Sequence, residues 1–578
     1  MKNTKRLILM CLCALLMTTM TGCKSEEAFN WSQLSAGTAS ASPAPTVTES
    51  SELNVGMPTA SGELNPLTNP SASMQGLFKL AFEGVMRLSD RYQPENWLAE
   101  SVARTEKGYT IMLRAGVLFH DGKGLTAQDV VDSFEAIRDA EASPWKSVIA
   151  PITAMTAEGE RELSVETEAG YAALYALTFP VVSSQQGNTF PAGTGPYRIA
   201  GYTQGETMDL FRWDSWWRTP ALIPSIHVIA REDAESELAT FQAGALDVCT
   251  ADMLTVSSVT QRASVSKQDY LTGQAELLLP NLRGVLGDVQ LRHAVAQALD
   301  KSDVITNTYQ NHGVAVDVPV LPDSWLAERT ESIECDVDAA REALAQLGWK
   351  DLDGDGYVER YASGQNEPQQ TPQPTDEPAA TDTPEPPPAD DVPENTGNKL
   401  DSLLGDANQN NTSSTMNRLS LTILTNEEDS SSHKDAASRL VTQLGKAGIE
   451  ATVTSVAFDK LDAAVEAGEY DLLLIGYQLP KNGDLSSLLR SDGINNRTGY
   501  ASSAMDAALD SLHTAQSAED YYNAMQKVYD LIMQDLPVYT LCMRTRTQVV
   551  DRNVMVSAVA HQDEPYRGIE TWTNIKEE

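Results

Sequence analysis

The chain has 578 residues, which is too long for one hydrophobic core, so we expect two or three lobes. Hydrophobic residues make up 41% of it, and 81 acidic against 42 basic residues give a net charge of −39. Such a charge repels nucleic acid phosphates and anionic lipid headgroups, so it excludes both as ligands of the folded surface. The acidic excess favours solubility as its purpose; selection of a cationic ligand is the alternative.

The first 22 residues predict a cleaved secretion signal that ends at a lipid-attachment site. A positively charged start is followed by the apolar run Leu7 to Met20 and by the tetrapeptide Met20-Thr21-Gly22-Cys23. The tetrapeptide resembles a bacterial lipobox, which makes Cys23 the acylated first residue of the mature chain. A membrane-spanning anchor is the alternative, but the run falls short of the roughly 20 apolar residues that a span needs. Residues 23–52, rich in Ser, Ala, Thr and Pro, predict a flexible tether.

Mixed α/β structure is predicted after the tether, and Leu53 to Gly56 is the first predicted strand. Tyr109 to Leu113 is strand-like, and Thr126 with Asp129 three residues later predicts a capping box that opens a helix. The apolar residues that follow mark the buried face of this helix: Val130, Val131, Phe134 and Ile137.

A second helix is predicted to begin near Asp288. Its apolar residues follow the i, i+3, i+4, i+7, i+8 spacing of a core-facing stripe: Leu291, Ala294, Val295, Ala298 and Leu299. Asp435 to Leu444 predicts a helix, Ala451 to Val456 a strand, and Leu472 to Gly476 a strand that is buried on both faces. This alternation of helices and strands predicts α/β lobes with parallel sheets.

An acidic, Pro-rich stretch separates these two groups of elements. Gln365 to Gly397 holds nine prolines and eight acidic residues without a Lys or Arg, so it lacks the apolar surface that would offset the entropy of ordering it. We predict a disordered insertion at about residues 362–416. Cys249, Cys335 and Cys542 are scattered and odd in number, which indicates buried small apolar residues with one disulfide possible and no paired metal spacing.

The pattern of chemically reactive residues predicts no catalytic residue and no cofactor. The seven histidines are dispersed, and the chain has no Gly-x-Ser-x-Gly elbow, no phosphate loop and no Cys-x-x-Cys pair. Asp351 to Gly356 matches the opening of a calcium loop, but the twelfth position is Ala362 where a bidentate Glu is needed, and Glu359 at the ninth position does not close the shell. We therefore interpret this stretch as a Gly/Asp-rich turn and predict no metal site.

Five sequence blocks stand out in order along the chain: Phe82–Val85 with Leu98–Ser101, Leu113–Gly122 continuing to Val130, Gly193–Tyr197, Asp288–Asp300, and Gly468–Tyr477 with Asp535–Pro537. Together they resemble the family 5 extracellular solute-binding proteins, the oligopeptide, dipeptide and nickel type that supplies ABC importers. They span roughly residues 53–578, and the Pro-rich insertion is the main interruption. In this context His120 and Asp121 are expected to form a structural turn, and Trp216 and Trp217 are expected to serve packing.

The resemblance implies a type II periplasmic-binding-protein fold with two hinged lobes, an extra domain and mixed sheets. Residues 53–83, 192–280 and 538–578 would form lobe I, residues 84–191 domain II, and residues 281–537 lobe III. The ligand would bind between the lobes and stabilise a closed form that the importer recognises.

In peptide-binding relatives, an Asp shortly after the Gly-Trp or Gly-Tyr end of the buried strand pairs with the amino terminus of the ligand. Pro480 occupies the approximate place of that Asp, so capture through a free amine is in doubt, and Asp484 is a substitute if the loop is shifted. By position alone, Thr59 and Asn65 of the loop Pro58–Asn65 are predicted to face the cleft. Three residues after the buried strand are predicted to line the opposite wall: Tyr477, Gln478 and Lys481. For Tyr477 a core aromatic is the alternative, and for Lys481 a solvated loop charge.

The resulting functional hypothesis is a lipid-anchored receptor, not an enzyme. It would capture a peptide or other small polar solute and deliver it to an ABC permease. We expect a monomer held by acylated Cys23 on the extracellular face of the bacterial cell membrane, without contact to nucleic acid. A ligand-sensing lipoprotein that presents a cue to a membrane partner is the main alternative. A scaffold with a degenerate cleft is another, and an enzyme whose site is invisible in sequence is the third.

Overall fold

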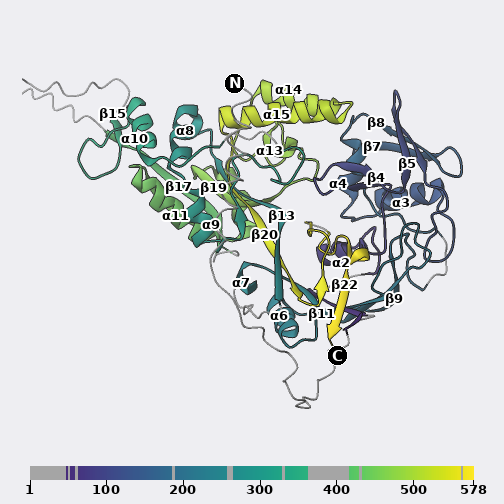
Figure 1. Cartoon of the computed structure of the whole chain (residues 1–578). Coiled ribbons are helices and arrows are strands. Elements are labelled where there is room, and N and C mark those ends of the chain that lie inside the picture. Colours follow the sequence, from purple (N-terminus) through teal and green to yellow (C-terminus); the bar gives the residue numbers. More distant parts are fainter. Residues whose placement is uncertain are drawn as a thin grey trace, which may run out of the picture. The chain divides into compact units, whose positions relative to one another are not determined.

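The computed structural model describes residues 47–49, 52–58, 63–184, 189–256, 265–327, 332–361, 416–427, 432–561 and 564–577 (Figure 1). The chain divides into two compact units, Met1–Thr48 with Glu577–Glu578 and Glu49–Lys576, and the following account concerns the second. The predicted signal peptide, Cys23, Thr59 and nearly all of the predicted insertion lie outside the described residues, as does the tether except around β1 (Val47–Glu49) and Glu52. Among the described helices, none combines the length and apolar character of a membrane span.

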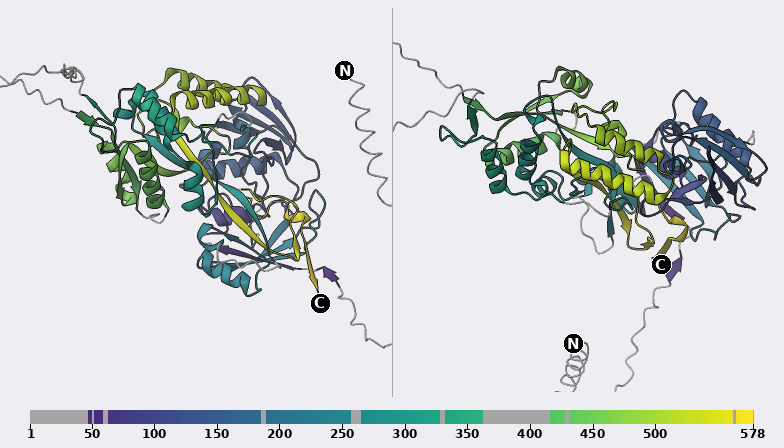
Figure 2. Two further views of the ribbon diagram at one scale, coloured as in Figure 1. Left: turned by 60° about the vertical axis from the view of Figure 1, so that its left-hand side comes forward. Right: turned by 90° about the horizontal axis from the view of Figure 1, so that it is seen from above.

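A mixed 11-stranded sheet forms the framework of the fold. Its order is β18-β17-β19-β13-β20-β12-β2-β11-β10-β9, and β14 (Gly313–Val314) pairs with β20. The two long strands β13 (Val265–Pro280) and β20 (Tyr539–Asp551) pair antiparallel and lie side by side in Figures 1 and 2. Their register shifts between Leu271 and Ala275, where Gly273 has a φ of +73°. This bulge divides the sheet into two parts. We call them the β2 end and the β19 end, each after one of its strands.

The β2 end of the sheet begins with β2 (Glu52–Pro58), which runs parallel to β11 (Ser225–Arg231) and contains the predicted first strand. The remaining elements here are β9 (Tyr197–Thr203), β10 (Thr207–Arg212), β12 (Val248–Ala251), α2 (Ala72–Phe78), α6 (Ala234–Gln242) and α7 (Met253–Val256). After β20 the chain adds β21 (Val554–Met555), η3 (Ile569–Thr571) and β22 (Thr573–Glu577). Trp572, which is fully buried, packs in the same core as Leu53 and Val55.

The β19 end of the sheet holds three mutually parallel strands: β17 (Ser420–Asn426), β18 (Glu450–Val456) and β19 (Leu472–Gln478). β13, however, pairs antiparallel with β19, so the prediction of parallel sheets is wrong for the sheet as a whole, and the mixed sheet implied by the resemblance is confirmed. The two strands of that pair lie nearly 200 positions apart in the chain, so local alternation carried no signal of their direction.

Helices pack around the β19 end, and the predicted helices at Asp288 and Asp435 are confirmed as α8 and α11. The helical elements are η2 (Val285–Gly287), α8 (Val289–Ala298), α9 (Lys301–Asn307), α10 (Val337–Gln346), α11 (His433–Lys446), α12 (Phe458–Ala467), α13 (Ser486–Leu489), α14 (Ser503–Thr514) and α15 (Ala518–Asp535). Asp288 caps α8, and the apolar stripe predicted for this helix is buried. A hairpin of β15 (Glu359–Tyr361) and β16 (Met416–Arg418) completes this end.

A buried polar cluster lies beside the bulge, on the β19 end of β13. Glu276 is fully buried, and its two carboxylate oxygens lie 2.9 Å from Nε2 of His433 and 2.9 Å from Nη1 of Arg544. Nδ1 of His433 lies 2.8 Å from the side-chain oxygen of Asn426. Burial would raise the pKa of Glu276, but the hydrogen bonds and charges of His433 and Arg544 outweigh burial and lower it. The carboxylate is therefore ionised inside the core.

A separate antiparallel sheet, β5-β6-β8-β7, and its helices form a third part, which we call the β5–β8 module. Its elements are β3 (Met86–Leu88), β4 (Pro94–Asn96), β5 (Ala99–Arg104), β6 (Gly108–Leu113), α3 (Ala127–Asp139), α4 (Lys146–Ile149), β7 (Ile152–Ala157), β8 (Glu162–Thr167) and α5 (Ala173–Ala176). The predicted strand Tyr109–Leu113 and the capping box of Thr126 and Asp129 are confirmed, and the predicted apolar face of α3 is buried.

The β5–β8 module contacts the turn between α14 and α15 closely. The amide of Gly170 donates to the carbonyl of His513 at 2.8 Å, and the amide of Tyr171 donates to that of Ala515 at 2.6 Å. A Cβ on Gly170 would lie 1.8 Å from the Ala515 carbonyl oxygen, so only glycine fits there. Tyr171 and Tyr175 pack against Tyr521 and Trp325, and the Trp325 indole donates to the Tyr175 hydroxyl at 3.0 Å. These contacts join two parts of the chain in one core.

The three described cysteines are unbonded. Cys249 and Cys542 are buried, as predicted, whereas Cys335 is exposed and the prediction of burial is wrong for it. Cys335 directly precedes Asp336, the capping residue of α10, in an extended segment at the surface.

Candidate ligand-binding pocket

A cavity of about 80 Å³ lies where several segments of the chain meet, and Thr178, Pro196 and Trp216 are part of its lining. Residues between Gly76 and Trp97 line one side, the C-terminal segment from His561 to Glu570 lines another, and Lys481 reaches it from the loop after β19. We call this cavity the pocket. It is smaller than the roughly 300–1,000 Å³ of common ligand sites, so in this conformation it accommodates one end group of a ligand.

Glu83 lines the pocket and accepts hydrogen bonds on both carboxylate oxygens. Oε1 accepts from the indoles of Trp97 (2.8 Å) and Trp216 (3.3 Å). Oε2 accepts from the indole of Trp217 (2.9 Å) and the hydroxyl of Thr194 (2.7 Å). Burial raises the pKa of Glu83, although these four hydrogen bonds oppose the shift. The two predicted packing residues, Trp216 and Trp217, therefore also hold a buried carboxyl group.

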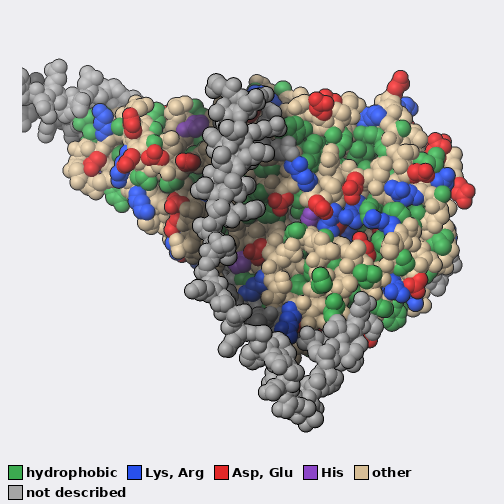
Figure 3. All heavy atoms as spheres, in the orientation of Figure 1, with side chains coloured by type: hydrophobic (Ala, Val, Ile, Leu, Met, Phe, Trp, Pro, Cys, Tyr) green, Lys and Arg blue, Asp and Glu red, His purple; other side chains and the backbone are tan. Residues whose placement is uncertain are grey.

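Arginine side chains cover the outer faces of these indoles. The guanidinium carbons of Arg87 and Arg218 lie 4.2 and 4.6 Å from the ring centre of Trp97, within range of cation–π attraction. Arg87 lines the pocket, and its buried Nε atom has no hydrogen-bond acceptor. On the face drawn in Figure 3, Lys and Arg side chains gather between α2 and α3, with acidic side chains and a His beside them.

The C-terminal wall of the pocket is held in place by Arg567. This buried side chain donates to Asp90 (2.8 Å), to Glu564 (2.6 Å) and to the carbonyl of Leu88 (3.0 Å). His561 stacks on Tyr92, with 4.7 Å between the ring centres. The C-terminal segment is thereby attached to β3 and the turn that follows it.

The residues predicted after β19 occupy different positions in the structure. Lys481 lines the pocket. Tyr477 is half-buried, and its hydroxyl lies 2.8 Å from the Ser487 hydroxyl, while Gln478 is exposed and donates at 3.4 Å to the carbonyl of Thr272 in the β13 bulge. Of these three residues, only Lys481 is part of the pocket lining.

Asp484 is engaged by its own neighbours. One oxygen lies 2.8 Å from Nε2 of His513 at the end of α14, and the other accepts from the Ser486 amide at 2.9 Å. Burial would raise the pKa of Asp484, but the hydrogen bond and charge of His513 outweigh it and lower the pKa; the same hydrogen bond raises the pKa of His513. Asp484 is thus paired within the fold.

Asn65, the other described candidate, shapes its own loop. Its side-chain oxygen accepts from the Leu67 amide at 3.0 Å, and its carbonyl accepts from the Asn69 amide at 3.0 Å. It is half-buried and does not belong to the lining of the pocket.

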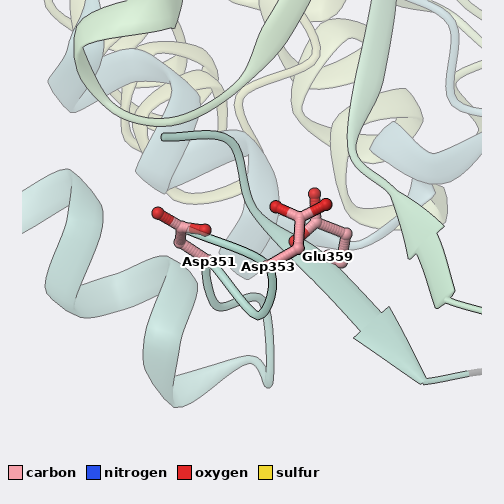
Figure 4. A group of neighbouring side chains, drawn as sticks. All are labelled: Asp351, Asp353 and Glu359. Carbon is pink, nitrogen blue, oxygen red and sulfur yellow. The ribbon is translucent and has the colours of Figure 1, made fainter. Parts of the chain in front are cut away.

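The Gly/Asp-rich turn brings carboxylates together at a distance from the pocket. Oxygen atoms of Asp351, Asp353 and Glu359 lie within 4.8 Å of one another (Figure 4). Arg418 of β16 lies among them, with Nε 3.1 Å from Glu359 and Nη2 3.5 Å from Asp353. Both oxygens of Asp351 accept backbone amides of the turn. The guanidinium thus pairs with two of these carboxylates and offsets part of their charge, while the turn's own amides bind the third, which favours the interpretation as a structural turn.

Residues 93–366 match the model of the bacterial extracellular solute-binding proteins, family 5, middle region. The oligopeptide-binding protein AppA of Bacillus subtilis is 22% identical over 343 residues, which cover 53% of this chain and 60% of AppA. The nickel-binding protein NikA of Staphylococcus aureus is 22% identical over 309 residues, covering 52% of this chain and 61% of NikA. The sequence matches thus span about 60% of the length of these two relatives.

Solved structures share the fold over most of the chain. The crystal structure of the nickel ABC transporter from Bacillus halodurans matches with a TM-score of 0.71 at 17% identity, over 89% of this chain and 98% of that one. The fold is that of a type II periplasmic binding protein, as the resemblance implied. With the family model, which covers just under half of the chain, and these relatives, the chain is similar to the family 5 extracellular solute-binding proteins. The relatives are named as binding proteins, which agrees at family level with the prediction of a non-enzyme.

Proposed function

We propose that this protein is a lipid-anchored solute receptor that captures a small polar solute, such as a short peptide, between two lobes and delivers it to an ABC importer. In this proposal, residues 53–83, 192–280 and 538–578 form lobe I, residues 84–191 domain II and residues 281–537 lobe III. Acylated Cys23 holds the monomeric receptor on the extracellular face of the cell membrane, and the closed form is the one presented to the permease.

The observation that carries the proposal is the composition of the pocket. Arg87 and Glu83 line it from one side and Lys481 from the loop after β19, while β13 and β20 connect the two ends of the sheet. A ligand that contacts both sides is bound more tightly by the closed form and shifts the population toward it.

Two measurements on the full chain in detergent test ligand capture. Mass spectrometry of the denatured protein identifies any solute that co-purifies, and a thermal-shift screen of peptides, amines, sugars and metal chelates identifies others. A ligand at about 100 times its dissociation constant adds roughly 2.7 kcal/mol of stability. Failure of every compound to shift the transition, together with an empty mass spectrum, would contradict ligand capture.

The anchor and the delivery step are tested in cells. Labelled palmitate is expected to be incorporated into the wild-type protein and not into Cys23→Ala. Cross-linking at lobe surfaces is expected to capture a permease when ligand is present. A wild-type protein without acyl chains would contradict the anchor, and ligand-independent capture of a membrane sensor without uptake would favour the ligand-sensing alternative.

A further inference from the structure

We propose that the pocket binds the carboxylate of its ligand through Arg87 and Lys481; this inference rests on the proposed function and names its substrate class. The two side chains reach the pocket from different segments of the chain, Arg87 from β3 and Lys481 from the loop after β19. An anionic group between them would link the two sides of the closed form. The ligand is therefore a carboxylate-bearing solute, for which a free amine is not required.

Arg87 is built to accept such a group. Its guanidinium is stacked on Trp97, whose indole is itself fixed by a hydrogen bond to Glu83, so the orientation of the arginine is set by packing. Its Nε is buried without a hydrogen-bond acceptor, and the nearest acidic atom, Oε1 of Glu95, is 3.8 Å away, beyond hydrogen-bond distance. The side chain remains 26% exposed. A planar carboxylate matches this donor geometry, and pairing with it satisfies the buried Nε.

The acidic residues at or near the pocket are largely engaged by donors of the protein. Glu83 accepts four hydrogen bonds from three indoles and a hydroxyl. Glu564 is paired with Arg567 at 2.6 Å, and Asp484, in the loop that carries Lys481, is paired with His513 at 2.8 Å. A ligand ammonium directed at any of these three would have to compete with an existing partner, and loss of that partner leaves a polar group unsatisfied.

Glu570 is the remaining acidic residue of the lining. It lies on η3, and its charge adds to burial, the larger cause, in raising the pKa of the Tyr197 hydroxyl. A zwitterionic ligand would direct its ammonium toward Glu570 while its carboxylate lies between Arg87 and Lys481. A zwitterionic ligand and a purely anionic ligand both carry this carboxylate. The variant Glu570→Gln distinguishes them, because it weakens only the binding of the ammonium.

The first test compares three forms of one probe by isothermal titration with the full chain in detergent: Ala-Ala, N-acetyl-Ala-Ala and Ala-Ala-amide. Removal of the amine charge is expected to change the dissociation constant of Glu570→Gln by less than about threefold, and a larger change in the wild type alone assigns the ligand ammonium to Glu570. Removal of the carboxylate is expected to weaken binding at least about tenfold, the value of a lost charge-assisted hydrogen bond. Succinate and inorganic phosphate are titrated in parallel.

Variants then assign the subsite. Arg87→Gln and Lys481→Gln are each expected to weaken binding of N-acetyl-Ala-Ala about 10- to 100-fold. Arg87→Lys keeps the positive charge but lacks the planar guanidinium, so it is expected to recover only part of the binding that Arg87→Gln loses. Lys107→Gln is the matched control, because Lys107 is 81% exposed on the same module and does not line the pocket. A thermal transition within the range of Lys107→Gln shows that the variants are folded.

The outcomes separate this inference from the proposed function. Equal binding of Ala-Ala and Ala-Ala-amide overturns the carboxylate assignment, and so does tighter binding of phosphate than of succinate. No binding of any carboxylate probe at about 10 mM also overturns it, because an intact subsite should hold a simple carboxylate at millimolar concentration. In each case the proposed function still stands if another solute co-purifies or shifts the thermal transition.

Discussion

Single residues near the pocket owe their roles to partners that are distant in the chain. Asp484 is bonded by His513, which lies 29 positions later, beyond α13 and near the end of α14. Glu83 is bonded by indoles that lie 14, 133 and 134 positions away. In both cases the side-chain type was visible in the sequence and the partner was not. The hydrogen bonds decide whether such a carboxylate faces a ligand or the fold.

The pair of Asp484 and His513 predicts a stability that depends on pH. Because the pKa of His513 is raised above 6.5, its stabilising contribution is complete below pH 6.5 and is lost as the pH rises through the raised pKa. The pKa of Asp484 is lowered below 3.8, so its contribution is present above pH 3.8 and is lost as the pH falls through the lowered pKa. The pair therefore stabilises the fold mainly between these limits.

His513→Asn is expected to remove the loss of stability that the wild-type protein shows above pH 6.5. Urea unfolding between pH 5 and pH 9 measures it, over a range chosen around the ordinary histidine value of about 6.5. His293→Asn serves as the control, because the ring of His293 bonds to the carbonyl of Gln534 and to no carboxylate that the structure records. The same pH slope in His513→Asn and in the wild type would show that the pair does not form in solution.

Glu83→Gln is expected to destabilise the fold by about 1–3 kcal/mol, the cost of one buried donor without an acceptor. Whichever way the amide turns, its NH₂ group faces at least one indole NH, Trp217 on one side or Trp97 and Trp216 on the other. Glu95→Gln on the neighbouring β4 is the control, since Glu95 is 45% exposed. Equal urea midpoints for the two variants would mean that the indoles find other acceptors.

At the scale of elements, local patterns in the sequence were sufficient to predict a helix or strand wherever the element carries its own capping residue and its own apolar stripe. The capping box of α3 is an example: the Thr126 amide donates to Asp129 at 3.0 Å, and the Asp129 amide donates to the Thr126 hydroxyl at 3.4 Å. The sequence predicted the helix and its capping box but not the hydrogen bonds from Lys123 and Ser184 to Asp129, because those two residues lie outside the motif.

Thr126→Ala is expected to cost about 1 kcal/mol of stability, as is common for the loss of a helix N-cap. Thermal and urea unfolding of the full chain measure it. Ser438→Ala is the control, because Ser438 is exposed on α11 and its hydroxyl bonds only to the Lys434 carbonyl. A loss no larger than that of Ser438→Ala would mean that Asp129 alone caps the helix.

At the scale of the whole molecule, the sequence predicted the order of the parts and not their contacts. The five blocks implied the lobes, yet nothing local indicated that Gly170 would be packed against the turn after α14 or that Lys481 would share a cavity with Arg87. Such contacts join residues hundreds of positions apart. Each depends on single residues, which form no periodic pattern in the sequence. The pocket itself was therefore predicted at Lys481 only.

Gly170→Ala is expected to separate the β5–β8 module from the turn between α14 and α15, because a Cβ there meets the Ala515 carbonyl oxygen at 1.8 Å. Amide exchange at residues 170 and 171 should accelerate, and stability should fall by about 1–3 kcal/mol, as for other overpacked sites. Gly159→Ala, where the nearest atom is 3.9 Å away, is the control. Protection equal to that of Gly159→Ala would show that this contact is absent in solution.

The cluster around Glu276 has a consequence for how the sheet assembles. β13 pairs with β19 and β20, strands that lie far along the chain, so no tight turn sets its register. A slip of one position would turn the Glu276 side chain to the opposite face of the sheet, away from His433 and Arg544, and leave an ionised carboxylate stranded in apolar surroundings. The pairing of Glu276 with His433 and Arg544 thus selects the register of β13, because losing it in a misaligned sheet costs more free energy than forming it contributes in the native one.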